Sequence, residues 1–251
     1  MDKGIEPFQS LSIIVPVVSE TKTFVETINI IFEVCNRKDL KEIIICPAYF
    51  ASPECIKTAQ NLCEKYHDFP MSILMQNGTF EDLIKDLFNT VAGSHFIFQP
   101  ADLEEDPRML PVYIQESIKH PDAIITGSRF LSKNHIKNFS TTKKIFYRFF
   151  HFFFKIVYSC NLTDTTYLIW VIPTKKVRNL ILHEKSYSVM YETFLKILRA
   201  GTKIIEIPVE SQKRSQGKRK VKFFRDGFHY LLTFFRVRFT NVNDFYKNTS
   251  L

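Results

Sequence analysis

Residues 95 to 107 read HFIFQPADLEEDP, a short apolar strand that ends in an acidic cluster. The first five residues are apolar and β-prone, and Asp102 and Glu104 then lie two positions apart, on one side of an extended turn. Oxygen-rich geometry of this kind suits a hard divalent cation. The same residues also fit a helix start, with Asp102 as N-cap, Glu104 and Glu105 in the first turn and Pro107 nearby. The stretch therefore predicts a strand followed by either a metal site or a helix N-terminus.

Outward from this strand, short apolar runs alternate with longer amphipathic segments. This rhythm predicts an α/β fold with a mainly parallel sheet and helices on both faces. Strands are expected at 11–18, 42–46, 71–75, 95–99, 123–126 and 203–209, and helices from the first strand to about 35 and near 53–65, 79–91 and 191–200. Ligands of such sheets sit beyond the carboxyl ends of the strands. Glu20, Pro47 and Asp102 all follow strand ends, so we expect them to share one crevice.

Two aromatic segments, 143–160 and 222–238, predict long helices with thin cationic stripes. The stripes are Lys144, Arg148, His151 and Lys155 in the first helix and Lys222, Arg225, His229 and Arg236 in the second. Basic amphipathic helices of this kind lie in membrane interfaces. The alternative is that both helices cover the sheet and turn their stripes to water.

Composition favours a single domain over residues 1–240, with a polar, frayed tail at 241–251. The 251 residues are 45% hydrophobic and include 25 phenylalanines, which excludes a disordered chain. No apolar run reaches the roughly 18 residues of a spanning helix, and the N-terminus has no secretion-signal pattern. We therefore expect a cytoplasmic protein, peripheral at a membrane. The five cysteines form no C-x-x-C pair, which predicts free thiols in a reducing compartment.

The formal charge of +8 is unevenly spread, because residues 212–225 include seven Lys or Arg and no acidic residue. An anionic partner is implied, whether phosphates, anionic lipid or nucleic acid. The run carries no recognised nucleic-acid motif, so we do not expect a nucleic-acid partner.

Five segments occur in the order found in family 2 glycosyltransferases, and the chain resembles most closely the dolichyl-phosphate mannose synthase branch. The segments are LSIIVPVVSE (11–20), PADLE (100–104), DAIITGSRF (122–130), LTDTTYLIW (162–170) and IPVESQKRSQGKRK (207–220). They keep the family's Pro16, Glu20, Asp102, Gly127, Ser128, Arg129, Asp164, Pro208, Arg214, Gly217 and Lys220. The resemblance implies a GT-A-type nucleotide-diphospho-sugar transferase fold.

The departures from the family lie mainly on the donor side. Pro100 replaces the first aspartate of the metal motif, so the motif is degenerate, with Glu104 at its glutamine. Pro47 and Ala48 stand where the family has an acidic pair that grips the nucleobase. On the acceptor side, more of the family's motif residues are kept.

The resemblance implies an inverting, metal-assisted transfer of a sugar from a nucleotide-sugar to a polyprenyl phosphate or similar lipid-linked acceptor. It assigns catalysis to Asp164 and Arg129, nucleotide binding to Pro16, Glu20 and Asp102, the acceptor phosphate to Arg129, Lys144, Arg148, Arg214 and Lys220, and Mg²⁺ or Mn²⁺ to Asp102 and Glu104. Without the resemblance, Asp164 fits an Asx turn or helix cap. The altered donor side leaves open an alternative, a catalytically degenerate homologue that acts as a binding or regulatory protein.

Overall fold

A computed structural model describes residues 6–131, 141–167, 169–186, 188–210 and 223–247. Within them lies one seven-stranded sheet with the strand order β3-β2-β1-β4-β6-β5-β7. The strands are β1 (Leu11–Val17), β2 (Leu40–Pro47), β3 (Met71–Ile73), β4 (His95–Phe98), β5 (Ile124–Ser128), β6 (Trp170–Pro173) and β7 (Ile204–Pro208). All pairs are parallel except those of β6, which runs antiparallel to both β4 and β5. The mainly parallel sheet predicted from the sequence is confirmed.

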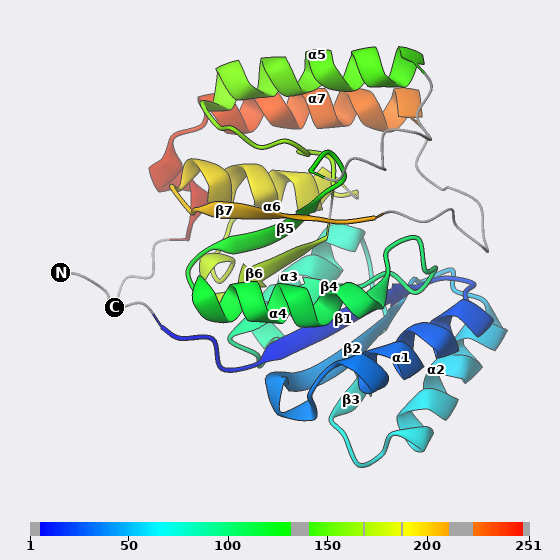
Figure 1. Ribbon diagram of the computed structural model, residues 1–251. Coiled ribbons are helices and arrows are strands. Elements are labelled where there is room, and N and C mark those ends of the chain that lie inside the picture. The colour runs from blue at the N-terminus through cyan, green and yellow to red at the C-terminus, as the bar shows by residue number, and fades with distance from the viewer. Residues whose placement is uncertain (1–5, 132–140, 168, 187, 211–222, 248–251) are drawn as a thin grey trace.

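Helices cover both faces of this sheet (Figure 1), and four short 3₁₀ turns lie between or after the described elements. The helices are α1 (Lys22–Val34), α2 (Pro53–Lys65), α3 (Phe80–Thr90), α4 (Leu110–Lys119), α5 (Thr141–Tyr158), α6 (Ser188–Arg199) and α7 (Phe223–Phe239). The turns are η1 (Arg37–Asp39), η2 (Pro107–Met109), η4 (Thr174–Lys176) and η5 (Val242–Phe245). One core cluster lies under α1, α2 and α4, and the second under α3 and α6, because strands buried on both faces carry apolar residues in unbroken runs.

Helices α5 and α7 form an outer layer that packs on α6 rather than on the sheet (Figure 1). Phe154 of α5 and Phe234 of α7 are fully buried beside each other, with ring centroids 5.6 Å apart. Phe154 also lies 6.5 Å from Phe194 of α6. No helix of the described residues is long and apolar enough to cross a bilayer.

Two sequence expectations need correction, and two elements were missed. The segment that follows Asp102 forms no helix until Pro107, and Asp106 rather than Asp102 caps that turn by accepting from the Arg108 amide. Residues 241–247 are not frayed, because Phe245 is fully buried and its carbonyl accepts from the Ile181 amide. Neither α4 nor β6 was predicted.

Pro16 lies inside β1, one residue before its end. The Ile14 carbonyl accepts from the Gln99 amide on the β4 side of the strand, and Pro16, two residues later, turns its nitrogen to that same side. The ladder between β1 and β4 has ended by then, at Ile14 and Phe98. A proline is tolerated in this central strand because no partner there needs its missing N–H.

Candidate active site

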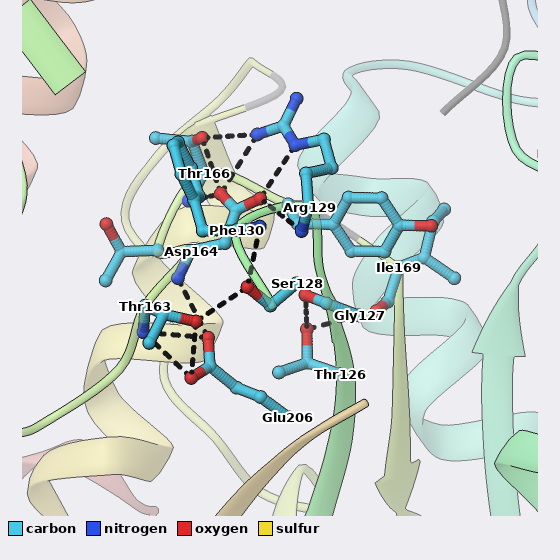
Figure 2. Close-up of polar contacts among 12 residues, drawn as sticks. Thr126, Gly127, Ser128, Arg129, Phe130, Thr163, Asp164, Thr166, Ile169 and Glu206 are labelled. Carbon is cyan, nitrogen blue, oxygen red and sulfur yellow. Dashed lines mark hydrogen bonds and ion pairs between the residues drawn. The ribbon is translucent and has the colours of Figure 1, made fainter. Parts of the chain in front are cut away.

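Arg129 directly follows β5 and makes a two-point ion pair with Asp164 (Figure 2). Its Nε lies 2.7 Å from Oδ2 of Asp164 and its Nη2 lies 2.9 Å from Oδ1, while the Arg129 amide donates to Oδ2 at 3.2 Å. The Asp164 side chain is fully buried and that of Arg129 is 14% exposed. The two residues that the resemblance names as catalytic are thus in contact, although their catalytic role stays a prediction.

Thr166 completes the shell around the Asp164 carboxylate. Its amide and its hydroxyl donate to Oδ1 of Asp164 at 3.3 and 3.0 Å, and its hydroxyl accepts from Nη2 of Arg129 at 2.7 Å. The bond to the Thr166 amide is the Asx turn that the sequence also allowed. Burial opposes ionisation of Asp164, but the hydrogen bonds and charge of Arg129 outweigh it and hold the pKa of this carboxyl below its usual value. The geometry favours a fixed counter-charge over a proton acceptor.

Glu206 of β7 holds the same loop from the other side (Figure 2). Its carboxylate accepts from the Thr163 amide at 2.8 Å, from the Asp164 amide at 2.8 Å and from the Thr163 hydroxyl at 3.0 Å. The Thr163 hydroxyl lies 2.6 Å from that of Ser128, at the end of β5. Burial raises the pKa of Glu206 and the Asp164 charge adds to this, while the amide hydrogen bonds lower it. Sequence reasoning missed Glu206, and its only signal was one acid inside the apolar strand IIEIP.

This cluster combines one guanidinium with two carboxylates. A phosphate that approaches Arg129 therefore meets a cation already neutralised by Asp164, and it needs further positive charge from elsewhere. Of the predicted phosphate ligands, Lys144 and Arg148 lie on α5 but their side chains fall outside the described residues, and Arg214 and Lys220 fall outside them entirely.

An open groove of about 530 Å³ runs along the edge of this cluster, between α5 and the chain that precedes Asp164. It is lined by His151, Phe152, Lys155, Asn161, Leu162 and Thr163. Nδ1 of His151 lies 3.3 Å from the Thr165 hydroxyl. Burial lowers the pKa of His151, and the positive charge of Arg129 adds to this against the opposing Asp164, which keeps the ring neutral at neutral pH. Lys155 is exposed and supplies a cation at the groove.

On the donor side, the loop after β4 carries Asp102, whose carboxylate accepts a hydrogen bond from the backbone of the same loop. Oδ1 of Asp102 accepts from the Glu104 amide at 3.0 Å, around Leu103 in a left-handed conformation at φ 57°. Asp102 is buried, whereas Glu104 is partly exposed. No group of three or more His, Cys, Asp or Glu side chains that could hold a metal occurs in the described part of the chain. A metal held at Asp102 and Glu104 would need most of its ligands from a substrate.

The loop after β1 is ordered by Glu20. Its Oε2 accepts from the amides of Val18 and Ser19 at 2.7 and 2.9 Å. Across the rim, Tyr49 and Phe50 follow β2 and are 71% and 50% exposed, with their rings 4.8 Å apart. These two rings therefore lie largely in solvent.

One contact joins the donor-side loop to the acceptor side. The Tyr167 hydroxyl donates a hydrogen bond to Oε2 of Glu105, and the Tyr167 ring lies under the Arg129 guanidinium at 5.7 Å. Sequence reasoning missed both Tyr167 and the pairing role of Glu105. No local signal exists for this contact, because 62 residues separate the two partners.

No protein-family model and no curated protein sequence matches the chain. Solved structures share its fold. Glucosyl-3-phosphoglycerate synthase from Mycobacterium tuberculosis, in complex with Mn²⁺, UDP and phosphoglyceric acid, matches with a TM-score of 0.64 and 11% identity, over 93% of this chain and 80% of that one. The same enzyme with Mn²⁺, UDP-glucose and phosphoglyceric acid gives 0.61 and 12%, over 92% and 80%.

A mycobacterial protein matches with a TM-score of 0.66 and 10% identity, over 91% of this chain and 74% of that one. At such identities a structural match establishes the fold, while activity depends on the site residues. The likeness to the dolichyl-phosphate mannose synthase branch stays a prediction from the sequence motifs. The chain has the GT-A fold of nucleotide-sugar glycosyltransferases.

Proposed function

We propose that the protein transfers a sugar, with inversion, from a nucleotide-sugar donor to a lipid-linked phosphate acceptor such as a polyprenyl phosphate. One observation carries this proposal. The Arg129–Asp164 cluster and the groove along α5 meet at the carboxyl edge of a GT-A sheet, where ligands of parallel sheets bind. Structural neighbours solved with UDP-glucose and phosphoglyceric acid are consistent with a phosphate-bearing acceptor.

The reaction needs no strong base in the protein. An oxygen of the acceptor phosphate attacks the anomeric carbon and forms the new C–O bond, while the bond from that carbon to the donor diphosphate breaks and the nucleoside diphosphate leaves with the electron pair. A phosphate monoester has a second pKa near 6, so it is already largely ionised at neutral pH. This chemistry fits Asp164, whose oxygens are all occupied and which would hold Arg129 in place for a phosphate.

Asp102, with Glu104, would contact a Mg²⁺ or Mn²⁺ ion that the donor diphosphate largely coordinates. Such an ion, when bound, neutralises the charge that develops on the leaving diphosphate. Pro100 provides no carboxylate there, so we expect weak metal binding before the donor is present.

The apolar surface next to the groove favours a lipid over a small soluble acceptor. Helix α5 exposes a stripe with spacings of three and four, made up of Phe149, Phe152 and Ile156. Helix α7 exposes a second stripe, made up of Leu231, Leu232, Phe235 and Phe239. Phe153 of α5 packs on Phe234 and Phe235 of α7, at 5.6 and 6.1 Å, so the two stripes adjoin. We call these seven residues the apolar face.

Cations lie beside the apolar face. Lys155 on α5 and Arg236 on α7 are exposed, although Arg236 also pairs with Glu184 and Glu192. An apolar strip flanked by cations fits an anionic membrane surface. We therefore propose a peripheral protein at the cytoplasmic face of a membrane, where the groove, which shares Phe152 with the apolar face, would receive the lipid acceptor.

The proposal is tested by incubating the protein with Mn²⁺, radiolabelled UDP-, GDP- or dTDP-sugars and a polyprenyl phosphate, with phosphoglyceric acid as the soluble acceptor. We expect a lipid-extractable labelled product from one donor. Arg129→Lys should lower its rate at least about tenfold, because an ammonium cannot replace two-point guanidinium contacts. Arg37→Lys is the matched control, since Arg37 pairs with Asp68 at the exposed surface.

Product from phosphoglyceric acid alone would overturn the lipid acceptor but leave sugar transfer standing. Failure of every nucleotide-sugar to bind at millimolar concentration would overturn the transferase itself. That second result would favour a catalytically degenerate homologue that acts as a binding or regulatory protein. The observation on its side is that Glu20 and Asp102, the acids kept at the donor rim, both accept hydrogen bonds from their own loops.

A further inference from the structure

The hydrogen bond from Tyr167 to Glu105 spans the two halves of the candidate site. Glu105 belongs to the loop after β4, which carries the donor-side acids Asp102 and Glu104. Tyr167 belongs to the loop that carries Asp164 and Thr166, the partners of Arg129. A displacement of either loop therefore has to stretch or break this bond.

The Tyr167 side chain is buried and closely packed. It is 5% exposed, and its ring lies against Gly127 of β5, where a Cβ atom would come within 2.4 Å of Cε1 of Tyr167 and within 2.8 Å of the Tyr113 hydroxyl oxygen. Both distances are far below van der Waals contact, so only glycine admits the ring at this depth. The ring also lies under the Arg129 guanidinium, at 5.7 Å from its centroid. The position of Tyr167 thus helps to set the position of Arg129.

The direction of the hydrogen bond is fixed. Burial raises the pKa of Tyr167 far above its usual value, and the neighbouring Tyr113 and Glu105 raise it further. Tyr167 therefore keeps its proton and donates it to Glu105 at any pH at which the protein functions.

Glu105 is itself tied to the backbone of the donor-side loop. The Gln99 side-chain amide donates to the Glu105 carbonyl at 3.0 Å and, at 3.3 Å, to the carbonyl of Pro100. Gln99 is buried at the end of β4, so the bond to Tyr167 extends a braced loop rather than a loose one. The contacts form a chain from the β4 edge through Glu105 and Tyr167 to Arg129.

We propose that Tyr167 and Glu105 are positioning residues that couple the donor-side loop to the Arg129–Asp164 cluster, so that ordering one orders the other. The coupling of the two loops is a property of the protein alone. Its consequence for substrates, that donor binding prepares the acceptor phosphate site, rests on the proposed function.

Site-resolved amide hydrogen exchange on the substrate-free, full-length protein tests the coupling. Tyr167→Phe retains the ring and removes only the hydroxyl, and Glu105→Ala removes the acceptor. Each variant should speed exchange about fivefold, the size of one lost hydrogen bond, at the Glu104 amide in one loop and at the Thr166 amide in the other. Glu105→Gln, whose amide oxygen still accepts from Tyr167, should restore the wild-type rates. Tyr66→Phe is the matched control, since its hydroxyl bonds to Asn29 instead.

Faster exchange confined to the mutated loop, or no rescue by Glu105→Gln, would overturn the coupling. The double variant Tyr167→Phe with Glu105→Ala should exchange no faster than either single variant, because all three lack the same bond. Additive effects would contradict the proposal. None of these readouts uses a nucleotide-sugar or a lipid, so the result stands apart from the transferase assay and the two can fail separately.

Discussion

At the scale of single residues, Glu206 makes the stability of the site loop dependent on pH. Burial raises its pKa in the native state above the ordinary value of 4.5, so the folded protein holds this proton more tightly than the unfolded chain. The stabilisation is complete below that ordinary value and is lost as the pH rises through the native pKa. Asp164 has the opposite sign, since its pKa lies below 3.8 and its contribution is lost only in stronger acid.

We therefore expect the free energy of unfolding of the wild type, relative to Glu206→Gln, to fall as the pH rises from about 4.5, with a slope of at most about 1.4 kcal/mol per pH unit. Urea unfolding of both proteins, followed at half-unit steps up to pH 8, measures this difference. The subtraction cancels groups that do not interact with Glu206, and Asp164 stays largely ionised over this pH range because its pKa lies below 3.8. A difference that stays level or rises with pH would show that the Glu206 carboxyl is not held in the way described.

At the scale of secondary-structure elements, α5 and α7 behave as a pair whose outward side has no partner within the described residues. Phe152 and Phe239 are 63% and 80% exposed, and burying such a side chain contributes about 1.5–3 kcal/mol. If the apolar face enters a membrane interface, Phe152→Ser combined with Phe239→Ser should weaken binding to vesicles that contain anionic lipid by at least about tenfold. Vesicle flotation over a range of lipid concentrations measures this change.

The matched control is Ile118→Ser, which removes an apolar side chain 52% exposed on α4, in the layer on the other face of the sheet. It should leave vesicle binding unchanged. Neutral vesicles and high salt should each weaken binding of the wild type, because the flanking cations are attracted to anionic lipid. Equal binding by the double variant and the wild type would exclude the apolar face as the membrane contact.

At the scale of the whole molecule, β4 joins the two halves of the sheet. It pairs with β1 on one edge and with β6 on the other, although it is only four residues long. The single domain over residues 1–240 stays a prediction, and calorimetry tests it. We expect one unfolding transition with a ratio of calorimetric to van't Hoff enthalpy of about 1. Two separable transitions would contradict a single cooperative unit.

A variant remote from the site sharpens this test. The Glu192 carboxylate is fully buried and pairs with Lys196 at 2.8 Å and with Arg236 of α7 at 3.2 Å. Loss of one partner from a buried ion pair costs about 3–5 kcal/mol, so Glu192→Gln should lower the melting temperature by roughly 10 °C. In a single domain the whole transition moves. Splitting into two transitions would mean that α6 and α7 unfold apart from the sheet.

The sequence by itself determined the elements whose signal is local. Apolar runs separated by amphipathic segments predicted most of the strands and helices, and residues 53–65 form a helix with the expected bounds. Ser52 accepts from the Cys55 amide and Pro53 is the first residue of that helix, so the signals for its start lie in adjacent residues. Arg129 and Asp164 could also be named, because each stands in a short recognisable motif.

Tertiary structure decided the contacts that join distant parts of the chain. The strand β6 was missed because its place and direction in the sheet depend on pairing with β4 and β5. Glu206 was missed because a single acidic residue in a strand is expected to face solvent. In the folded protein, the loop that contains Thr163, 43 residues earlier, covers it. The bond between Tyr167 and Glu105 belongs to the same class. Periodicity and capping act over a few residues, whereas the pairing of buried polar groups is fixed only when the folded chain removes them from water.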